Sequence, residues 1–542
     1  MNANATRDLY AAEGLRYMPQ VLCMLDQNPL SPTYGCGDRQ FWLYKSIDYQ
    51  GGMYGEFAFP LALAYAHSFP GNVYYGAEKI RDLALAVIRN QLRSAHKDGS
   101  NDDFYPFERA MGSTAFTLYA MAEAARVLTV DDQDILAFLG RRAGWLAGKH
   151  ETGRLSNHHA LAALGLASTA ELTGDAALRR QSDICRDRVL GWQTEEGWFP
   201  EYGGFDPGYH TLTLTFLAYL RRITGDDVLT GPLARAVTLA ADMVGEDGSM
   251  GGEVGSRNSY HFFPHGFELL AAEMGPARYV ADRFLDSLKT GRRGYLDENR
   301  TFCHYQYNYL QSWLDFADRQ TCPDWRPEDG VRRYDRAGLI TVRRNGIHAV
   351  VSLNKGGVVK ASTKAGPMAS DTGLVVTKSG GGVYAPAIEG GSDIAVSVGG
   401  DGKDIIEVSA DFEKIPNTIL PSTAKMAVLR LLNYTIGRLA PNLLRGIIQY
   451  LLIKRKSPFP VRVRRRIEVD GNGIVVKDRL SRTAQSVRIS GLSSSSDLTT
   501  IYTASSNSWA PSRIFSWVDL KGRVDDFNKT GEIEVERTWP KN

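Results

Sequence analysis

Apolar residues recur at intervals of three and four along roughly the first 325 residues, which is the period of amphipathic helices. Turn-like stretches rich in Gly, Asp and Asn separate these segments. Two segments end in nearly the same sequence, Glu171-Leu-Thr-Gly-Asp175 and Arg222-Ile-Thr-Gly-Asp226. Similar helix-ending sequences about 50 residues apart predict repeated helical hairpins. Such hairpins either continue as a solenoid or close into a toroid. The predicted helices cover residues 57–67, 80–92, 113–128, 135–146, 158–172, 212–223, 232–243 and 267–274.

The pattern changes near Arg333, where short β-branched runs bounded by glycine turns begin. Strands at this density predict an antiparallel β-sandwich. We therefore expect a helical domain at residues 1–328 and an antiparallel β-sandwich domain at 329–542. The predicted strands cover residues 338–344, 348–353, 373–378, 404–409, 461–469, 473–477 and 531–537.

One segment interrupts the strands, a basic helical insertion at about 424–456. Arg, Asn and Pro break its apolar runs, so it is too short and too polar to span a bilayer. It is either a helix packed on the sandwich or at a subunit contact, or a basic amphipathic helix on an anionic membrane surface.

Composition narrows the function classes. A length of 542 residues predicts two or three domains, and a net charge of +2 gives no case for nucleic acid binding. The N-terminal residues lack the pattern of a secretory signal, which predicts a cytoplasmic protein, or a periplasmic or secreted one whose leader was removed. Five scattered cysteines without CxxC spacing predict reduced, mostly buried thiols and no structural zinc.

Three polar clusters contain half of the ten histidines. They are Asn157-His158-His159, Tyr209-His210, and Asn258-Ser-Tyr260-His261 with His265 just beyond. Tyr209 follows Asn157 by 52 residues, and His261 follows Tyr209 by 52. The equal spacing indicates the same edge of successive repeats. Converging Tyr and His side chains transfer protons without a metal or cofactor.

The glycine-rich loop at 196–210 leads into the second cluster. It carries Trp198, Glu201 and Tyr202, whose rings and carboxylate suit sugar rings and hydroxyls. A purely structural loop has a similar composition. Tyr209 then falls at the N-terminus of a predicted helix, where the helix dipole favours a phenolate.

Other candidates have two interpretations each. Ser156 or Asn157 suits a helix N-cap, and His158 or His159 suits core packing. Arg109 either binds a substrate carboxylate or pairs with Glu108. The sequence leaves open which of Tyr260, His261 and His265 faces the substrate; His304-Tyr-Gln-Tyr307 is a further candidate segment.

At these residues the chain resembles the heparinase II/III-like polysaccharide lyases, including related alginate lyases. The matching motifs are Asn157-His158, Tyr209-His210 after Pro200-Glu201, and the region near His261. The segment Ser31–Lys45 is similar to heparinase-like proteins of bacterial polysaccharide gene clusters. The resemblance implies an N-terminal incomplete (α/α) toroid of helical hairpins followed by an antiparallel β-sheet domain.

The resemblance also implies a β-elimination. Such lyases remove the C5 proton of a uronate and expel the O4 oxygen, leaving a 4,5-unsaturated uronate. Asn157 and His158 match the residues that neutralise the carboxylate, with Arg109 as a helper, and Tyr209 matches the base. Lowering the pKa of a tyrosine from about 10 to near 7 takes roughly 4 kcal/mol. The leaving oxygen takes a proton from Tyr209 or a histidine, His261 before His265. His159, His210, Tyr202, Glu201, Trp198 and Tyr260 are expected to bind substrate.

We expect an acidic polysaccharide or oligosaccharide substrate and no cofactor. The family's His-x-Asp motif, which contributes to a metal site, corresponds here to Ala369-Ser370-Asp371 without a histidine. Three alternatives remain: a glycoside hydrolase with two carboxylates from Asp102, Asp103, Glu201 and Asp206, a uronyl C5-epimerase, and a non-catalytic glycan-binding protein. The polymer, endo or exo action and the oligomeric state are open at this point.

Overall fold

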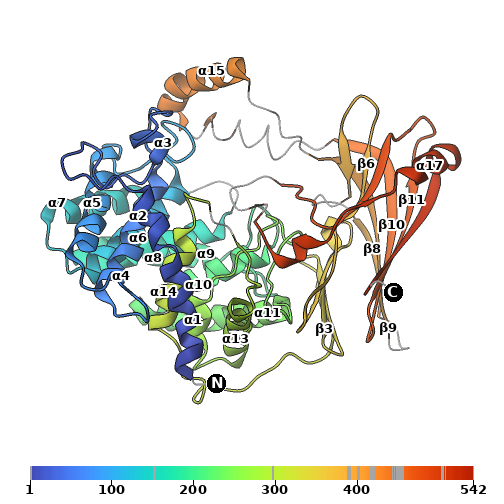
Figure 1. The fold of residues 1–542 in the computed structure, drawn as a ribbon, viewed down its shortest axis with the longest axis horizontal. Coiled ribbons are helices and arrows are strands. Elements are labelled where there is room, and N and C mark those ends of the chain that lie inside the picture. Colours follow the sequence, from blue (N-terminus) through green and yellow to red (C-terminus); the bar gives the residue numbers. More distant parts are fainter. Residues whose placement is uncertain are drawn as a thin grey trace.

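The computed structural model describes residues 3–149, 154–295, 298–386, 392–398, 403–415, 422–441, 443–444, 446, 457–501, 506 and 508–540. Helices fill the first part of the chain and antiparallel strands the second (Figure 1). The helices of the first part are α1 (Ala3–Arg16), α2 (Met18–Met24), α3 (Arg39–Trp42), η1 (Gly52–Phe57), α4 (Ala58–Ala66), α5 (Glu78–Ser94), α6 (Met111–Val127), α7 (Gln133–Ala147), α8 (Ser156–Thr173), α9 (Ala176–Leu190), α10 (Pro207–Thr224), η2 (Asp227–Leu229), α11 (Thr230–Met243), α12 (His265–Leu270), α13 (Gly275–Lys289) and α14 (Cys303–Leu314).

The inner helices close into a ring. In order around it, α4, α6, α8, α10, α12 and α14 each pack on the next, and α14 packs back on α4. Helices α6, α8 and α10 are buried on nearly all sides, because Ala, Gly, Ser and Thr alternate with larger apolar residues along them. Among the other helices, α5, α7, α11 and α13 are amphipathic and cover this ring from outside. The predicted toroid of helical hairpins is confirmed.

All eight predicted helices are present, but several others were not predicted. Helix α9 is one example, since its buried face consists of Leu178, Ser182, Cys185 and Val189. Ser and Cys at two of these four positions weaken the apolar period. Helices α1, α2, α13 and α14 are the other long segments without a prediction.

The strands form two antiparallel sheets among the described residues. One sheet has the order β1-β2-β3-β4-β5, and the other β13-β12-β6-β7-β9-β10-β11-β14, with β8 also pairing with β9. The strands are β1 (Gly330–Tyr334), β2 (Leu339–Arg344), β3 (Ile347–Ser352), β4 (Val358–Thr363), β5 (Gly366–Asp371), β6 (Gly373–Thr377), β7 (Val383–Ala385), β8 (Ser392–Val398), β9 (Lys403–Lys414), β10 (Pro458–Asp470), β11 (Ile474–Arg482), β12 (Gly491–Ser495), β13 (Val518–Asp519) and β14 (Glu532–Trp539).

The first sheet lies between the toroid and the second sheet. Its side chains on one face pack against those of β9, β10 and β11. On the side of the toroid, Arg343 binds Glu246 at 2.6 Å, and Nε2 of His348 lies 2.9 Å from the carbonyl oxygen of Asp242. The last toroid helix ends at Leu314 and the first strand begins at Gly330, while the exact boundary at 328/329 stays a prediction.

The insertion at 424–456 is helical where the structure describes it, as α15 (Thr423–Leu432) and the π-helical turn Asn433–Gly437. Residues 442, 445 and 447–456 lie outside the described residues. The helix packs on the toroid rather than on the sandwich: Tyr434 and Arg430 bind Asp48 at 2.5 and 2.9 Å. Among the described helices, no stretch is long and apolar enough to cross a membrane.

The cysteine prediction is confirmed: all five thiols are free and four are buried.

Figure 1 shows α15 next to α3, at the outer margin of the molecule.

Candidate active site

Tyr209 is the third residue of α10, as the sequence predicts, and only 7% of it is exposed. The helix begins there because Pro207 suits the first turn and the Asp206 carboxylate accepts the Tyr209 backbone N–H at 3.0 Å. The same carboxylate accepts the backbone N–H of Arg257 at 2.9 Å. One buried aspartate therefore fixes the start of α10 and the following polar loop together.

Arg257 lies directly against Tyr209. Its guanidinium carbon is 3.7 Å from the centroid of the Tyr209 ring and 4.9 Å from that of Tyr202, and Nη1 binds Oε2 of Glu201 at 3.1 Å. Burial alone would lower the pKa of Arg257, but negative charge on Tyr209, Tyr202 and Glu201 raises it above its usual value. The guanidinium is therefore a permanent cation beside the Tyr209 phenol.

Asn157 reaches the same group through Glu201. Oε1 of Glu201 accepts the backbone N–H of Asn157 at 3.0 Å and its side-chain Nδ2 at 2.7 Å. Burial raises the pKa of Glu201 although Arg257 and Asn157 oppose this shift. The N-cap prediction is wrong: α8 begins at Ser156, and its N-cap residue is Leu155, whose side chain accepts no hydrogen bond. Asn157 is instead a buried amide oriented by a carboxylate.

His261 approaches Tyr209 from another side. The two ring centroids are 4.8 Å apart with the planes perpendicular, and Nδ1 of His261 is hydrogen-bonded to the Tyr305 hydroxyl. Burial holds the pKa of His261 well below its usual value, and His304 and Arg257 lower it further. The imidazole is therefore neutral at physiological pH.

His158 and His304 complete the group on either side of Phe116. His304 stacks on Phe116 at 4.1 Å between centroids, and the Phe116 ring meets His158 at 6.2 Å, edge to face. Nδ1 of His304 lies 2.8 Å from the carboxylate of Glu56, which is fully buried. His158 lies against Gly112, where a Cβ would come within 2.6 Å of the imidazole. Gly112 thus permits His158 to sit at the start of α6.

Of the predicted catalytic residues, Asn157, His158, Tyr209 and His261 lie in this group, together with Glu201 and Tyr202. All are at or near the N-terminal ends of inner helices, so the equal spacing did indicate one edge of the toroid. Their roles stay predictions.

The structure places other predicted residues elsewhere. His159 packs edge-on against Trp192, and Nε2 of His210 lies 2.9 Å from the carbonyl oxygen of Ala236, between α10 and α11. His265 pairs with Asp315, which also binds Arg222 near the opposite end of α10.

Trp198 and Arg109 are held by neighbouring carboxylates. The indole N–H of Trp198 donates to Glu196, which in turn accepts backbone N–H groups of Arg336 and Ala337 from the β part. Arg109 forms an ion pair with Asp98.

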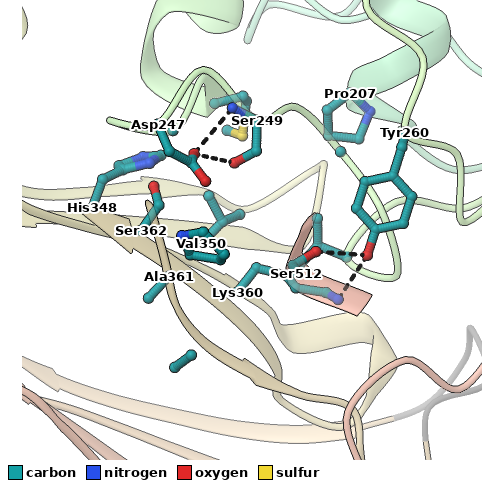
Figure 2. Close-up of a pocket in the computed structure, with 16 residues that line it drawn as sticks. Pro207, Asp247, Ser249, Tyr260, His348, Val350, Lys360, Ala361, Ser362 and Ser512 are labelled. Carbon is teal, nitrogen blue, oxygen red and sulfur yellow. Dashed lines mark hydrogen bonds between the residues drawn. The ribbon is translucent and has the colours of Figure 1, made fainter. Parts of the chain in front are cut away.

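Tyr260 points away from its neighbour His261, into the contact between the toroid and the first sheet. Figure 2 shows its hydroxyl bonded to Lys360 and Ser512, and it also donates to Glu253. The adjoining cavity has a volume of about 30 Å³, which suits one or two water molecules and is too small for a sugar. Tyr260 therefore joins the two parts of the chain.

Two residues of the group, Arg257 and Glu56, were not predicted. His304 and Tyr305 belong to the further candidate segment that the sequence indicates, and Arg257 stands beside the third cluster. Glu56 lies in the short η1 turn before α4 without any motif. Among the described residues, no three His, Cys, Asp or Glu side chains are arranged to hold a metal ion.

No protein-family model matches the chain, and no curated protein sequence matches it. Solved structures that are similar to it include three polysaccharide lyases. A xanthan lyase from Paenibacillus has a TM-score of 0.52 and 10% identity, over 90% of this chain and 46% of that one. The chondroitin AC lyase of Streptomyces coelicolor A3, in complex with chondroitin sulphate, has a TM-score of 0.52 and 12% identity, over 91% and 68%. Heparinase III has a TM-score of 0.49 and 13% identity, over 80% and 63%.

The chain thus spans between about half and two thirds of the length of these proteins. At such low identity the similarity concerns the fold. The chain has the fold of the xanthan and chondroitin AC lyases, an (α/α) toroid followed by antiparallel sheets, so the predicted resemblance to polysaccharide lyases is confirmed at the level of the fold.

Proposed function

We propose that the protein is a polysaccharide lyase that cleaves a uronate-containing polysaccharide by β-elimination. The observation that carries this proposal is the position of Tyr209 between the cation of Arg257 and the neutral imidazole of His261. A nearby positive charge favours the phenolate form of a tyrosine. A helix N-terminus favours it too. Tyr209 is thus set up as a base that needs no metal or cofactor.

The uronate carboxylate has to be neutralised before the C5 proton becomes acidic enough to remove. Asn157 and His158 are proposed for this task. Nδ2 of Asn157 has two N–H groups, of which Glu201 accepts one, so the second is suited to the substrate carboxylate. His158 is partly exposed at the start of the same helix. Hydrogen bonds aimed at developing charge in a largely buried site stabilise the enolate-like transition state.

In the elimination the Tyr209 phenolate takes the C5 proton. The electrons of the C5–H bond form the C4=C5 double bond, and the C4–O4 bond breaks. The Tyr209 hydroxyl then returns the proton to O4. Neutral His261 is a poor proton donor because its pKa lies well below its usual value, so we assign the return step to Tyr209 and the orientation of the phenol to His261.

Hydrolysis by two carboxylates is less well supported. Each carboxylate considered for it already has a structural partner: Glu201 binds Arg257 and Asn157, Asp206 caps α10, Asp103 binds Arg300, and Asp102 binds His96. Inverting and retaining hydrolases need one carboxyl group as acid and a second as base or nucleophile. The observation on Tyr209 favours elimination over this alternative.

The test is to mix the protein with a panel of uronate polysaccharides and follow the ultraviolet absorbance of the unsaturated uronate. We expect absorbance to rise with at least one polymer, and Tyr209→Phe to slow it by about 10²- to 10⁴-fold. Tyr75→Phe is the control, because Tyr75 is 57% exposed and lies outside this group, and it should retain full activity. New reducing ends without absorbance would instead indicate a hydrolase, and an unchanged rate in Tyr209→Phe would refute the mechanism.

A further inference from the structure

The outward face of α15 is apolar and exposed. Val428, Leu431 and Leu439 are 57%, 64% and 87% exposed. Their spacing of three and eight residues places them on one side of the helix that runs through the π turn. Thr435 lies between them on this face, and its hydroxyl already donates to the carbonyl oxygen of Leu431. Large aliphatic side chains gathered on one exposed face are characteristic of a docking surface.

The opposite face already holds the helix in place. Arg430 and Tyr434 bind Asp48, Tyr434 meets the ring of Phe107 at 5.4 Å, and Asn433 is buried. The helix is therefore attached to the toroid by its polar and aromatic side. The apolar stripe lies on the other side of the helix from this attachment, so its composition needs a separate explanation.

The charge of this segment is unusually one-sided. Between Ile415 and Ser457 the sequence contains no Asp or Glu, and its basic residues are Lys425, Arg430, Arg438, Arg445, Lys454, Arg455 and Lys456. By helical spacing, Lys425 and Arg438 flank the apolar stripe on its two sides. An apolar stripe flanked by cations complements a surface with anionic head groups above hydrocarbon.

The α3 region adjoins α15 on the side of the helix that is attached to the toroid. Lys45, which follows α3, lies beside Arg430 and Tyr434, the two residues that bind Asp48. Lys45 thus adds a further cation close to α15.

We propose that the apolar stripe of α15 docks the protein on an anionic phospholipid bilayer, with the helix lying in the plane of the interface. A second copy of the chain is a poorer occupant, because a symmetric contact would bring two uniformly basic segments together. An acidic polysaccharide would match the charges but leave the aliphatic side chains without a partner. Only the lipid interface satisfies both features.

The test is flotation of the full-length protein with vesicles of phosphatidylcholine alone or with about one third phosphatidylglycerol. We expect binding to the anionic vesicles that weakens with salt. Val428→Ser with Leu431→Ser and Leu439→Ser should reduce it about tenfold or more. Val228→Ser is the matched control, since Val228 is 58% exposed in a different region, and it should bind like the wild type.

Three outcomes would overturn the proposal. One is the absence of binding to anionic vesicles, and another is equal binding by the triple variant. The third is a concentration-dependent dimer that the triple variant abolishes, which would assign the stripe to a second copy. Circular dichroism melting of the triple variant checks that the chain remains folded, and Lys425→Glu with Arg438→Glu tests the charges without altering the stripe.

Discussion

At the scale of single residues, the charge of Arg257 matters most to the proposed chemistry. Its guanidinium covers the Tyr209 ring at 3.7 Å and also binds Glu201. Arg257→Met keeps much of the volume and removes the cation. We expect kcat to fall by roughly 10²- to 10³-fold. We also expect the acidic limb of the pH–rate profile to move to higher pH, because the phenolate loses its stabilising charge.

Arg257→Lys separates the two effects. It restores a cation without the planar guanidinium that binds Glu201 and stacks on the ring. The acidic limb should return towards its wild-type position while the rate stays low. A residue with only a structural role would lower the rate in both variants and leave the profile of each unmoved.

His210 packs in the core between α10 and α11. Because its pKa is shifted there, it should make the stability of the protein depend on pH. Burial lowers its pKa to about 4, against about 6.5 in an unfolded chain. Between these pH values the unfolded chain binds a proton that the folded chain does not. The free energy of unfolding should therefore fall as the pH drops from about 6.5 to about 4, with His210 contributing up to about 3 kcal/mol.

His210→Gln isolates this contribution, because glutamine keeps an N–H donor for the Ala236 carbonyl and does not titrate. His261 and His348 have lowered pKa values as well, so the wild type retains several proton-linked groups. Urea unfolding at a series of pH values should show a shallower pH slope for His210→Gln than for the wild type, by up to about 1.4 kcal/mol per pH unit. Equal slopes would contradict the assignment.

At the scale of elements, the start of α10 is a shared anchor. The Asp206 carboxylate accepts backbone N–H groups from Tyr209 and Arg257 and is also bonded to the Ser259 hydroxyl. Asp206→Ala removes a helix cap and leaves buried donors unpaired, so we expect the free energy of unfolding to fall by about 2–4 kcal/mol. Activity should fall too, since two residues of the site lose their common support.

The control for this prediction is another N-cap far from the site. Asp175 caps α9 by accepting the backbone N–H of Ala177 at 2.7 Å, and it is exposed. Asp175→Ala should cost about 1 kcal/mol in thermal or urea unfolding with no change in activity. Similar losses of activity in both variants would mean that general stability, rather than the anchor, limits the rate.

The sequence predicts elements better than contacts, for identifiable reasons. The apolar period of α6, α8 and α10 is continuous, so their positions and the three polar clusters at helix starts could be predicted. The sequence could not predict which histidine faces the candidate site. His261 and His265 are only four residues apart, but α12 begins at His265, and this places the His265 side chain against Asp315. Trp198 likewise leaves the site because Glu196 binds the β part, a contact that no local pattern encodes.

At the scale of the whole molecule, residues of the β part bind the loop that carries Arg257 of the candidate site. Lys355 Nζ donates to the carbonyl oxygen of Gly255 at 3.0 Å and also binds Asn258. Lys360 binds Glu253 and Tyr260. The loop between Glu253 and His261, which carries Arg257, is therefore held by Lys355 of the turn between β3 and β4 and by Lys360 of β4. The catalytic geometry of the toroid should depend on residues that lie outside the toroid.

Lys360→Met tests this dependence. The change leaves the Glu253 carboxylate and the Tyr260 hydroxyl in a buried contact without their lysine, so the free energy of unfolding should fall by about 3 kcal/mol. At a temperature where the variant is still folded, kcat should also fall, because the loop that carries Arg257 loses a fixed point. Adding Glu253→Gln to this variant removes the carboxylate that has lost its closer cation, with Arg513 still 3.4 Å away, and should recover part of the stability. Lys364→Met, on the exposed turn after β4, is the matched control and should change neither quantity. Full activity in folded Lys360→Met would show that the toroid holds its site without help from the β part.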